Sequence, residues 1–331
     1  MNHNIHKQQT MGVKLLHTFL RSISHSSRGI REITLDFLRN KKIAIDVSIY
    51  LYRYQSQSML IENIFKMCSI FREYNIQAIF VFDGEEKVER KRDTRMKRKM
   101  KKKEALAEYN NYSKQLRIAN PREKKAIEEK MKQLKKKIVY ITHKDIAQVK
   151  MLLKAYGITY MVAIGEADVL CAALAKANLV YACMSEDTDM FVYGVPRVIK
   201  YFSLMKHTGV LYETQKILDD LHIDMDNFRH LCVVSGTDYN TSVGSIYKFY
   251  KLFCKYAKIY KDANSDNTFL KWLAGNYISM QNYYKLLDIN IIYNIDTSKI
   301  LQEYAYIIIK NKEINFIALK DILSKNNFIF S

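Results

Sequence analysis

Residues 179–193, LVYACMSEDTDMFVY, join a short apolar run to three acidic residues. An uninterrupted apolar run of this length, bounded by polar residues, is typical of a buried strand in a parallel sheet. Ligands of such sheets usually bind where the strands end. Alternation along an extended chain would point Asp187 and Asp189 to the same side, where like charges need a cation, Lys or Arg beside them. The stretch therefore predicts an α/β fold with positive charge at this strand end.

The chain before this stretch repeats the pattern of an apolar run that ends in an acid. Residues 41–54, KKIAIDVSIYLYRY, contain a strand that ends in Asp46, and residues 76–84, IQAIFVFDG, contain one that ends in Asp83. A helical stretch at 60–74 lies between them, so the three segments predict a βαβ unit of a parallel sheet.

Further acids lie beside apolar segments later in the chain. Residues 143–163 read as helix, glycine stop and strand, and the helix predicted at 165–178 opens with Glu166 and Asp168, where a helix N-terminus favours negative charge. The apolar, strand-like stretch 228–240 ends in Asp238. Beyond residue 245 the chain is expected to be helical.

Seven acids thus share one pattern, because each follows an apolar strand-like segment or opens a helix just after one. At one edge of a parallel sheet they could not all stay ionised without cations. Oxygen ligands without His or Cys select Mg²⁺ or Mn²⁺ over zinc, and two such ions about 4 Å apart serve in-line displacement at phosphorus. Taken singly, an acid at a strand end is more often a helix N-cap or a surface turn residue. The seven are Asp46, Asp83, Glu166, Asp168, Asp187, Asp189 and Asp238.

A basic run separates the two halves of the predicted sheet. Residues 87–138 hold 21 Lys and Arg against 7 Asp and Glu. The composition is helical, Asn120-Pro121 marks a break between two helices, and few residues are suited to a core, so the pair is expected to project from the sheet. Most charge runs are simply solvated helix faces, but those usually mix signs. The run favours a polyanionic partner.

Composition limits the class of protein. The 331 residues carry 53 Lys and Arg against 34 Asp and Glu, a net charge of +19 that favours nucleic acid first and anionic membrane second. The basic run lacks the apolar face of a membrane-binding helix. Five scattered cysteines indicate reduced thiols, and neither a membrane span nor a secretory signal is apparent. A soluble intracellular protein is expected.

Six segments together carry a resemblance to a known family. They occur in that family's order and spacing between Met11 and Tyr239. The segments are MGVKLL (11–16), IAIDVSIYLY (43–52), FVFDG (80–84), ITHKDIAQVKMLLKAYGITYMVAIGEADVLCAAL (141–174), SEDTDMFVYG (185–194) and LCVVSGTDY (231–239). On these residues the sequence resembles the flap endonucleases, the XPG-type structure-specific 5′ nucleases.

The resemblance implies a PIN-like, Rossmann-like core with a mostly parallel sheet, spanning residues 11–235 after an N-terminal extension, 1–10. A helical arch would be inserted at 87–140, and residues 236–331 would form a helix-hairpin-helix-like module that binds duplex DNA. Two metal ions, Mg²⁺ or in its place Mn²⁺, would lie between two groups of acids. The first group would be Asp46, Asp83, Glu166 and Asp168, and the second Asp187, Asp189 and Asp238.

The resemblance also implies basic catalytic residues at the foot of the arch. They would be Arg90 and Lys97, or Lys91 and Arg98 if the register slips by one residue. Further roles in substrate binding are implied for Tyr52, which would stack on a base, for Gly12 near the active site, and for the arch residues Lys101 and Lys102. The opposite interpretation of Tyr52, a core tyrosine, stays open.

Three departures from the family pattern affect these expectations. Ten residues precede Met11-Gly12, so translation starts at Met11 or the usual glycine contact is absent. In VGSIYKF (243–249), Ser245 and Tyr247 stand where the family has the glycines of a hairpin that approaches DNA and helps to hold K⁺. Residues 319–331 lack a clear peptide for docking on a sliding clamp.

The expected function is that of a Mg²⁺-dependent 5′ nuclease that cuts 5′ flaps or degrades 5′ ends of DNA in replication, repair or recombination. We expect a monomer, in a nucleus or a viral replication compartment. Two alternatives stay open, a 5′ to 3′ exoribonuclease and a catalytically silent nucleic-acid-binding scaffold.

Overall fold

The computed structural model describes residues 12–23, 29–85, 92–240, 244–260, 268–304, 308–326 and 328, with the backbone alone at 92–95. The N-terminal extension 1–10, the alternative start Met11, and Arg90 and Lys91 of the two predicted arch pairs lie outside the described residues. No described helix is long and apolar enough to cross a membrane.

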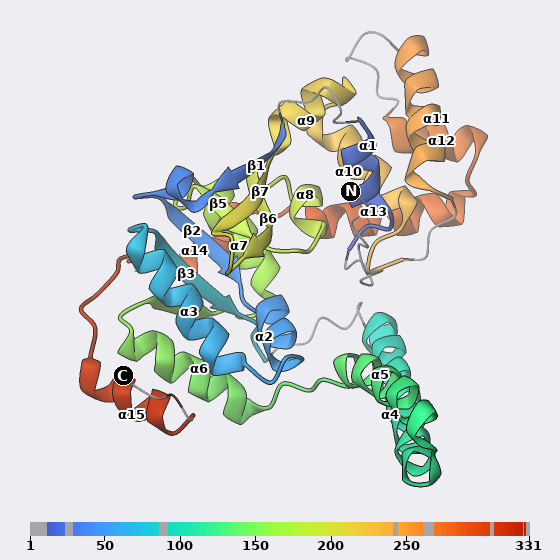
Figure 1. Ribbon diagram of the computed structural model, residues 1–331. Helices are drawn as coiled ribbons and strands as arrows, with labels where there is room; N and C mark the ends of the chain where they lie inside the picture. Colours follow the sequence, from blue (N-terminus) through green and yellow to red (C-terminus); the bar gives the residue numbers. More distant parts are fainter. Residues whose placement is uncertain are drawn as a thin grey trace.

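A seven-stranded sheet forms the centre of the molecule (Figure 1). Its strand order is β1-β7-β6-β5-β2-β3-β4, in which the five strands from β6 to β4 run parallel, β7 pairs antiparallel with β6, and the edge strand β1 pairs antiparallel with β7. This confirms the predicted mostly parallel α/β fold. The strands are β1 (Ile30–Thr34), β2 (Lys42–Asp46), β3 (Gln77–Phe82), β4 (Thr159–Val162), β5 (Ala182–Met184), β6 (Arg197–Ser203) and β7 (Thr208–Glu213).

The two faces of the sheet bury separate cores because successive strand residues point in opposite directions. Ile43 and Ile45 of β2 face one core, whereas Ala44 faces the other. The helices of the first face are α2 (Ser48–Gln55), α3 (Leu60–Glu73), α6 (His143–Ala155) and α15 (Phe316–Ser324), of which α3 and α6 lie in the lower part of Figure 1. Those of the second face include α1 (Leu16–Ile23), α7 (Ala167–Lys176), the short α8 (Asp189–Val192), α9 (Thr214–Leu221) and α10 (Met225–Ser235).

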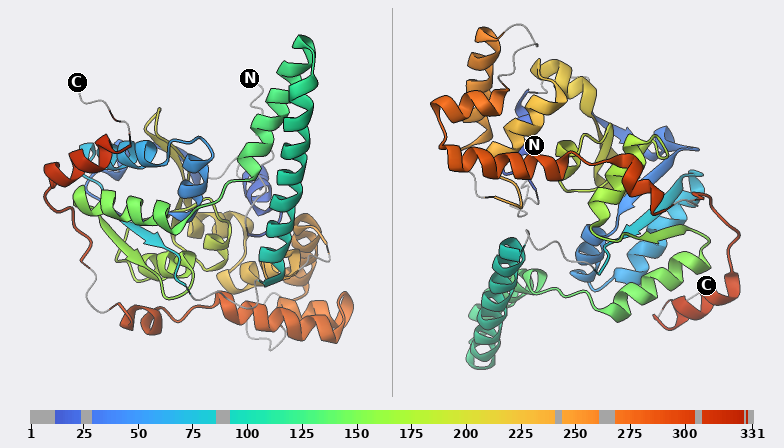
Figure 2. Two further views of the ribbon diagram at one scale, coloured as in Figure 1. Left: turned by 90° about the horizontal axis from the view of Figure 1, so that it is seen from below. Right: turned by 180° about the vertical axis from the view of Figure 1, so that it is seen from behind.

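The basic run forms two helices that project from the body (Figure 2). They are α4 (Arg92–Ile118) and α5 (Pro121–Lys137). Asn120 caps α5 in a capping box with Glu123, which confirms the predicted break at Asn120-Pro121. Only Ala105 and Leu134 are buried among the described side chains of the pair, so packing between the helices is thin and the charged faces stay in solvent.

The C-terminal part is helical, as expected, but its last segment leaves the other helices. α11 (Ile246–Ile259), α12 (Phe269–Asn276) and α13 (Met280–Tyr293) pack with α10, and α14 (Thr297–Gln302) packs on α7. Residues 308–315 then run back along the sheet edge, where Lys312 N–H donates to the Gly157 carbonyl at 2.7 Å. α15 packs on α6. The expected module of residues 236–331 is therefore divided between two sites on the core.

Two local expectations were wrong. The strand-like stretch 228–240 is mostly the helix α10, so Asp238 follows a helix end. The chain is also not extended through Asp187 and Asp189, because β5 ends at Met184 and Asp189 opens α8. Apolar runs of this length suit a buried helix as well as a buried strand, and periodicity does not separate the two.

Candidate active site

The ends of β2 and β3 bring together the first two acids. Asp46 is the last residue of β2 and Asp83 follows β3 directly, in adjacent parallel strands. Ser48, at the start of α2, lies between them: its hydroxyl donates to Asp83 Oδ2 at 2.5 Å and its amide donates to Asp46 Oδ1 at 3.3 Å. Ser48 thereby fixes the orientation of both carboxylates.

The N-terminus of α7 adds Glu166 and Asp168. Glu166 is the N-cap residue of α7, as the predicted helix start implied, and Asp168 is buried in the first turn. The amide of Ala167 donates to Asp83 Oδ1 at 2.9 Å, which ties the helix start to the end of β3. The Tyr239 hydroxyl donates to Glu166 Oε2 at 3.3 Å. Glu166 thus connects the strand ends with the segment that holds Asp238.

The turn after β5 carries Asp187 and Asp189, both of which are buried. The Ser185 hydroxyl donates to Asp46 Oδ2 at 3.0 Å and accepts the amide of Asp187 at 3.1 Å, so one serine connects the ends of β5 and β2. The Asp189 amide donates to Asp187 Oδ1 at 3.0 Å. The fully buried Tyr293 of α13 donates to Asp189 Oδ2 at 2.8 Å, which fixes the second acid from a distant helix.

Gly12 lies against the same turn. Its φ of +79° is in the region that favours glycine, and a Cβ built there would lie 2.4 Å from Asp187 Oδ1 and 2.5 Å from both Asp189 Oδ1 and Thr188 Oγ1. The backbone around residue 12 therefore closes over two of the acids, and any larger side chain would enter the site. Gly12, which was expected near the active site, therefore contacts the turn that carries Asp187 and Asp189.

The acids act on one another electrostatically. Burial, together with the charges of Asp83 and Asp187, raises the pKa of Asp46 to about 7. No three Asp, Glu, His or Cys side chains of the described chain lie close enough together to hold a metal ion as they stand. The donor set nevertheless fits a hard divalent ion, because it is built from carboxylate oxygens whose mutual repulsion a cation would relieve.

Positive charge reaches the acids from the arch. Arg98 on α4 donates to Asp238 Oδ2 at 2.7 Å, whereas Lys97 and Lys101 are exposed. Lys97 and Arg98 are the described members of the two predicted pairs of arch residues, and Arg98 is the one that contacts an acid. Tyr52 on α2 is 45% exposed rather than a core residue, and the ammonium of Lys102 lies 4.7 Å from its ring centroid.

A second positive group lies beneath the SEDTD turn. The buried Lys200 of β6 donates to the Glu186 carbonyl, and its charge interacts with Asp187. The Glu186 carboxylate accepts from Arg53 at 3.1 Å and from the Tyr201 amide at 2.9 Å. Positive charge was expected beside the acids at this strand end, and Lys200 and Arg53 provide it. Their contacts with Glu186 hold the turn that carries Asp187.

We predict that Glu186→Ala lowers the free energy of unfolding by about 3 kcal/mol, because it leaves Arg53 without its partner in a poorly solvated site. The matched control is Glu62→Ala, which breaks only the exposed ion pair with Lys66 on α3 and is expected to cost less than about 0.5 kcal/mol. Urea unfolding of both variants measures the difference. Equal losses would show that the Glu186 pair does not stabilise the turn.

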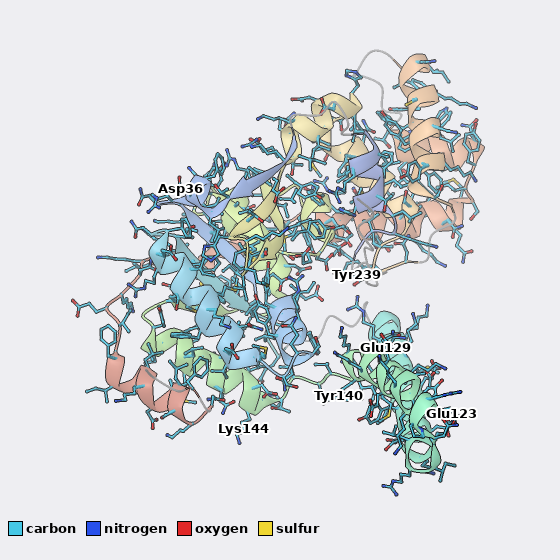
Figure 3. The ribbon with its side chains drawn as sticks, in the orientation of Figure 1. Asp36, Glu123, Glu129, Tyr140, Lys144 and Tyr239 are labelled. Carbon is cyan, nitrogen blue, oxygen red and sulfur yellow. The ribbon has the colours of Figure 1, made fainter. Side chains whose placement is uncertain are left out.

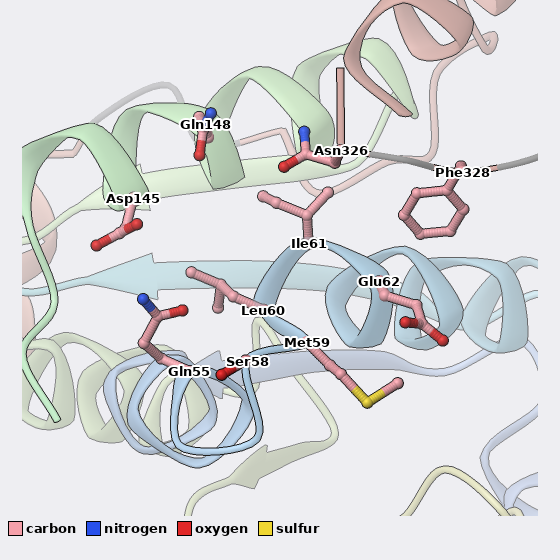
Figure 4. A pocket seen from close by; sticks show the side chains of 10 residues that line it. All are labelled: Gln55, Ser58, Met59, Leu60, Ile61, Glu62, Asp145, Gln148, Asn326 and Phe328. Carbon is pink, nitrogen blue, oxygen red and sulfur yellow. The ribbon is translucent and has the colours of Figure 1, made fainter. Parts of the chain in front are cut away.

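A pocket of about 470 Å³ lies elsewhere on the molecule (Figure 4). It is lined by the end of α2, the α2–α3 connection and the first turn of α3, by Asp145 and Gln148 of α6, and by Asn326 and Phe328. None of the seven acids lines it, so we place the chemistry at the strand ends and not in this pocket.

Comparisons with known proteins fit this geometry. Family models of the XPG N-terminal domain and the XPG I-region match residues 11–105 and 157–238, and together these ranges contain all seven acids. Flap endonuclease 1 of Encephalitozoon cuniculi is 30% identical over 253 residues, which cover 71% of this chain and 70% of the relative. The chain belongs to the flap endonuclease family.

Other members of the flap endonuclease family are similarly distant. Flap endonuclease 1 of Glycine max is 29% identical over 255 residues, which cover 71% of this chain and 63% of the relative. The chain thus spans just under two thirds of the length of this relative, and a similar share, 65%, of the one from Methanocaldococcus jannaschii.

Solved structures with low sequence identity share the fold. The catalytic core of Rad2 in complex with DNA substrate superposes with a TM-score of 0.64 at 20% identity, covering 95% of this chain and 94% of that one. Human GEN1 in complex with Holliday junction DNA superposes with a TM-score of 0.59 at 19% identity, covering 96% of this chain and 74% of that one. The fold of this flap endonuclease relative is therefore the one seen in those enzymes.

Several residues that shape this family site were missed from the sequence. Ser48 and Ser185 lie two residues from Asp46 and Asp187, a spacing that could have suggested hydroxyl donors. Lys200 and Tyr293 had no local signal, because one lies in a strand that the sequence did not predict and the other is 104 residues from Asp189. Tertiary packing alone brings those two to the acids.

The altered hairpin has a defined structure in its described part. Ser245 is the N-cap of α11, where its hydroxyl accepts the Lys248 amide at 3.3 Å. Tyr247 packs edge-on against Phe19 of α1. A capping residue and a packing residue thus stand at the two positions where the resemblance implied glycines, and together they fix the start of α11 on the body.

Proposed function

We propose that this protein is a structure-specific 5′ nuclease that hydrolyses phosphodiester bonds of DNA at 5′ flaps or 5′ ends. The observation that carries the proposal is the meeting of acids from β2, β3, α7 and the β5 turn, with Arg98 of the basic arch contacting Asp238. Membership of the flap endonuclease family supports the same reaction and substrate. Replication, repair or recombination of DNA, in a nucleus or a viral compartment, is the proposed setting.

The acids are suited to hold two Mg²⁺ ions, with Mn²⁺ as a substitute, in the two predicted groups. Bound divalent ions would polarise the scissile phosphate and lower the pKa of the attacking water. The chain itself orients the acids through Ser48, Ser185 and Tyr293, and the guanidinium of Arg98, which contacts Asp238, would neutralise charge on the phosphate.

The arch and the C-terminal helices are suited to the two parts of a flap substrate. The lysines and arginines of α4 and α5 would attract a single-stranded 5′ end, and α11 would lie near the duplex with four exposed lysines, 248, 251, 255 and 258, at helical spacing. Contacts of this kind go to phosphates, so we expect steep salt dependence and little base specificity. We propose that the protein acts as a monomer.

The test is digestion of a labelled 5′-flap DNA duplex with Mg²⁺ or with EDTA, beside a single-stranded RNA of the same sequence. Mg²⁺-dependent products near the flap junction support the proposal. Preferential digestion of the RNA would replace it with a 5′ to 3′ exoribonuclease. Binding of the flap without any cleavage would replace it with the silent scaffold.

We predict that Arg98→Gln slows flap cleavage about 100-fold, because a lost contact to developing charge costs roughly 3 kcal/mol. Lys97→Gln is the matched control, since it removes an exposed positive charge one residue away and is expected to change the rate less than about threefold. Single-turnover rates at saturating enzyme separate this effect from binding. A larger loss for Lys97→Gln would favour the other register, Arg90 with Lys97.

A further inference from the structure

Lys102 lies between two exposed aromatic rings at the foot of the arch. Its ammonium is 4.7 Å from the ring centroid of Tyr52 and 4.9 Å from that of Tyr140, and it donates to the Val139 carbonyl at 2.8 Å. The three side chains come from α2, α4 and the link between α5 and α6. Figure 3 shows Tyr140 where the arch joins the body. The contact therefore joins both legs of the arch to the core.

The cluster lies beside the acids. Asp83 and Arg98 both act electrostatically on the Tyr52 hydroxyl, and Arg98 itself donates to Asp238. A strand that places a phosphate among the acids and passes beneath the arch would therefore meet this cluster next. The bases of that strand would be unpaired and available to stack.

The exposure of the two rings points to a ligand. Tyr52 is 45% exposed and Tyr140 is 55% exposed, although each ring already contacts Lys102. Aromatic faces with a cation between them match the repeat of a single strand, in which bases stack on rings and the phosphate pairs with the ammonium. Burial lowers the pKa of Lys102 because it disfavours the charged ammonium. A phosphate beside this ammonium would favour the charged form again.

We propose that Tyr140 is a further residue that stacks on a base, and that it completes a nucleotide clamp on the single-stranded 5′ segment of the substrate with Tyr52 and Lys102, whose substrate-binding roles the resemblance already implies. The inference rests on the proposed function for the identity of the strand. In the free protein the ammonium occupies the space between the rings. On binding, Lys102 turns to a phosphate and the ring faces become available to bases.

The experiment is an abasic scan of the single-stranded tail. The full-length protein is titrated with flap duplexes in Ca²⁺ in place of Mg²⁺, to limit cleavage, and each tail position in turn lacks its base while its phosphate remains. Wild type is expected to lose about tenfold in affinity at one or two positions, because stacking on one ring is lost. In Tyr140→Leu the loss at one of those positions should vanish, whereas Tyr140→Phe keeps it.

The control variant is Tyr284→Leu, which removes a 61% exposed tyrosine of α13 and should retain the wild-type pattern. If Tyr140 only braces the arch, Tyr140→Leu will bind more weakly but keep the full abasic loss, and the inference fails. It also fails if wild type shows no abasic loss at any position. Thermal melting of each variant shows whether it is folded.

A second measurement needs no variant. Iodouracil placed at the sensitive tail position should crosslink to wild-type Tyr140 under ultraviolet light, and a crosslink elsewhere would overturn the assignment. Both measurements read binding and not hydrolysis, so they are independent of the proposed reaction. If binding depends on a base of the tail but Mg²⁺ produces no cleavage, the clamp is supported and the proposed nuclease activity is overturned. If the protein cleaves the flap but no abasic position weakens binding, the nuclease activity is supported and the clamp is overturned.

Discussion

Asp187→Asn is expected to slow cleavage of a 5′-flap DNA in Mg²⁺ by about 1,000-fold. Asp187 lies in the turn after β5, beside Asp46 and Asp189, and we propose that it is a ligand of a divalent ion. Loss of one charged ligand weakens the Lewis-acid contribution by several kcal/mol, and about 4 kcal/mol corresponds to 1,000-fold. The amide oxygen of Asn can still accept the Asp189 amide, so the turn is preserved.

Three readouts separate the loss of metal from the loss of fold. Asp36→Asn is the matched control, because Asp36 is an exposed acid that pairs only with Arg39 among the described contacts, and its activity should equal wild type. In EDTA at pH 8, Asp187→Asn should melt no lower than wild type, because repulsion on Asp46 is relieved. The increase in melting temperature that Mg²⁺ produces should be smaller in Asp187→Asn than in wild type. Unchanged activity with unchanged Mg²⁺ stabilisation would remove Asp187 from the site.

Gly12→Ala is expected to destabilise the protein by about 3 kcal/mol and to lower flap cleavage at least tenfold. The new methyl group would lie 2.4 Å from Asp187 Oδ1 and 2.5 Å from Asp189 Oδ1, and the backbone has a φ of +79° that alanine disfavours. Either the loop lifts from the turn or both acids move. Thermal melting in EDTA and single-turnover cleavage in Mg²⁺ measure the two effects.

Gly275→Ala provides the control for this change. Gly275 lies in α12, and a methyl group added there would have no neighbouring atom within 4 Å, so alanine should stabilise the helix by about 0.5 kcal/mol or more and leave cleavage unchanged. If Gly12→Ala melts and cleaves as this control does, the backbone around residue 12 does not close over the acids.

The local pattern of the sequence was sufficient to predict the central strands and the helix that packs on them. Apolar runs ending in Asp46 and Asp83 became β2 and β3, and the acid-led helix after Gly165 became α7. These elements were predictable because strand burial and helix capping depend on neighbouring residues. The stretch ending in Asp238 was mistaken for strand-like, because a buried helix and a buried strand both present unbroken apolar residues.

The contacts that orient the acids were not predictable in the same way. Lys200 lies beneath Glu186 because β6 pairs with β5, and Tyr293 reaches Asp189 because α13 packs into the second core. The sequence also did not show which basic residue of the arch contacts an acid, and in the structure Arg98 donates to Asp238 whereas Lys97 is exposed. A helix turns by about 100° per residue, so neighbouring basic residues face different directions, and only packing decides which one faces the site.

The sequence by itself determined the fold class, the acidic strand ends, the two-helix basic insertion and the resemblance to the flap endonucleases. All of these follow from residue types and short-range spacing. Only the tertiary structure decided that Gly12 closes over Asp187, that Lys200 lies beneath the SEDTD turn, and that Lys102 sits between Tyr52 and Tyr140. Those contacts join segments distant in the chain, and burial of two shared cores, not local propensity, brings them together.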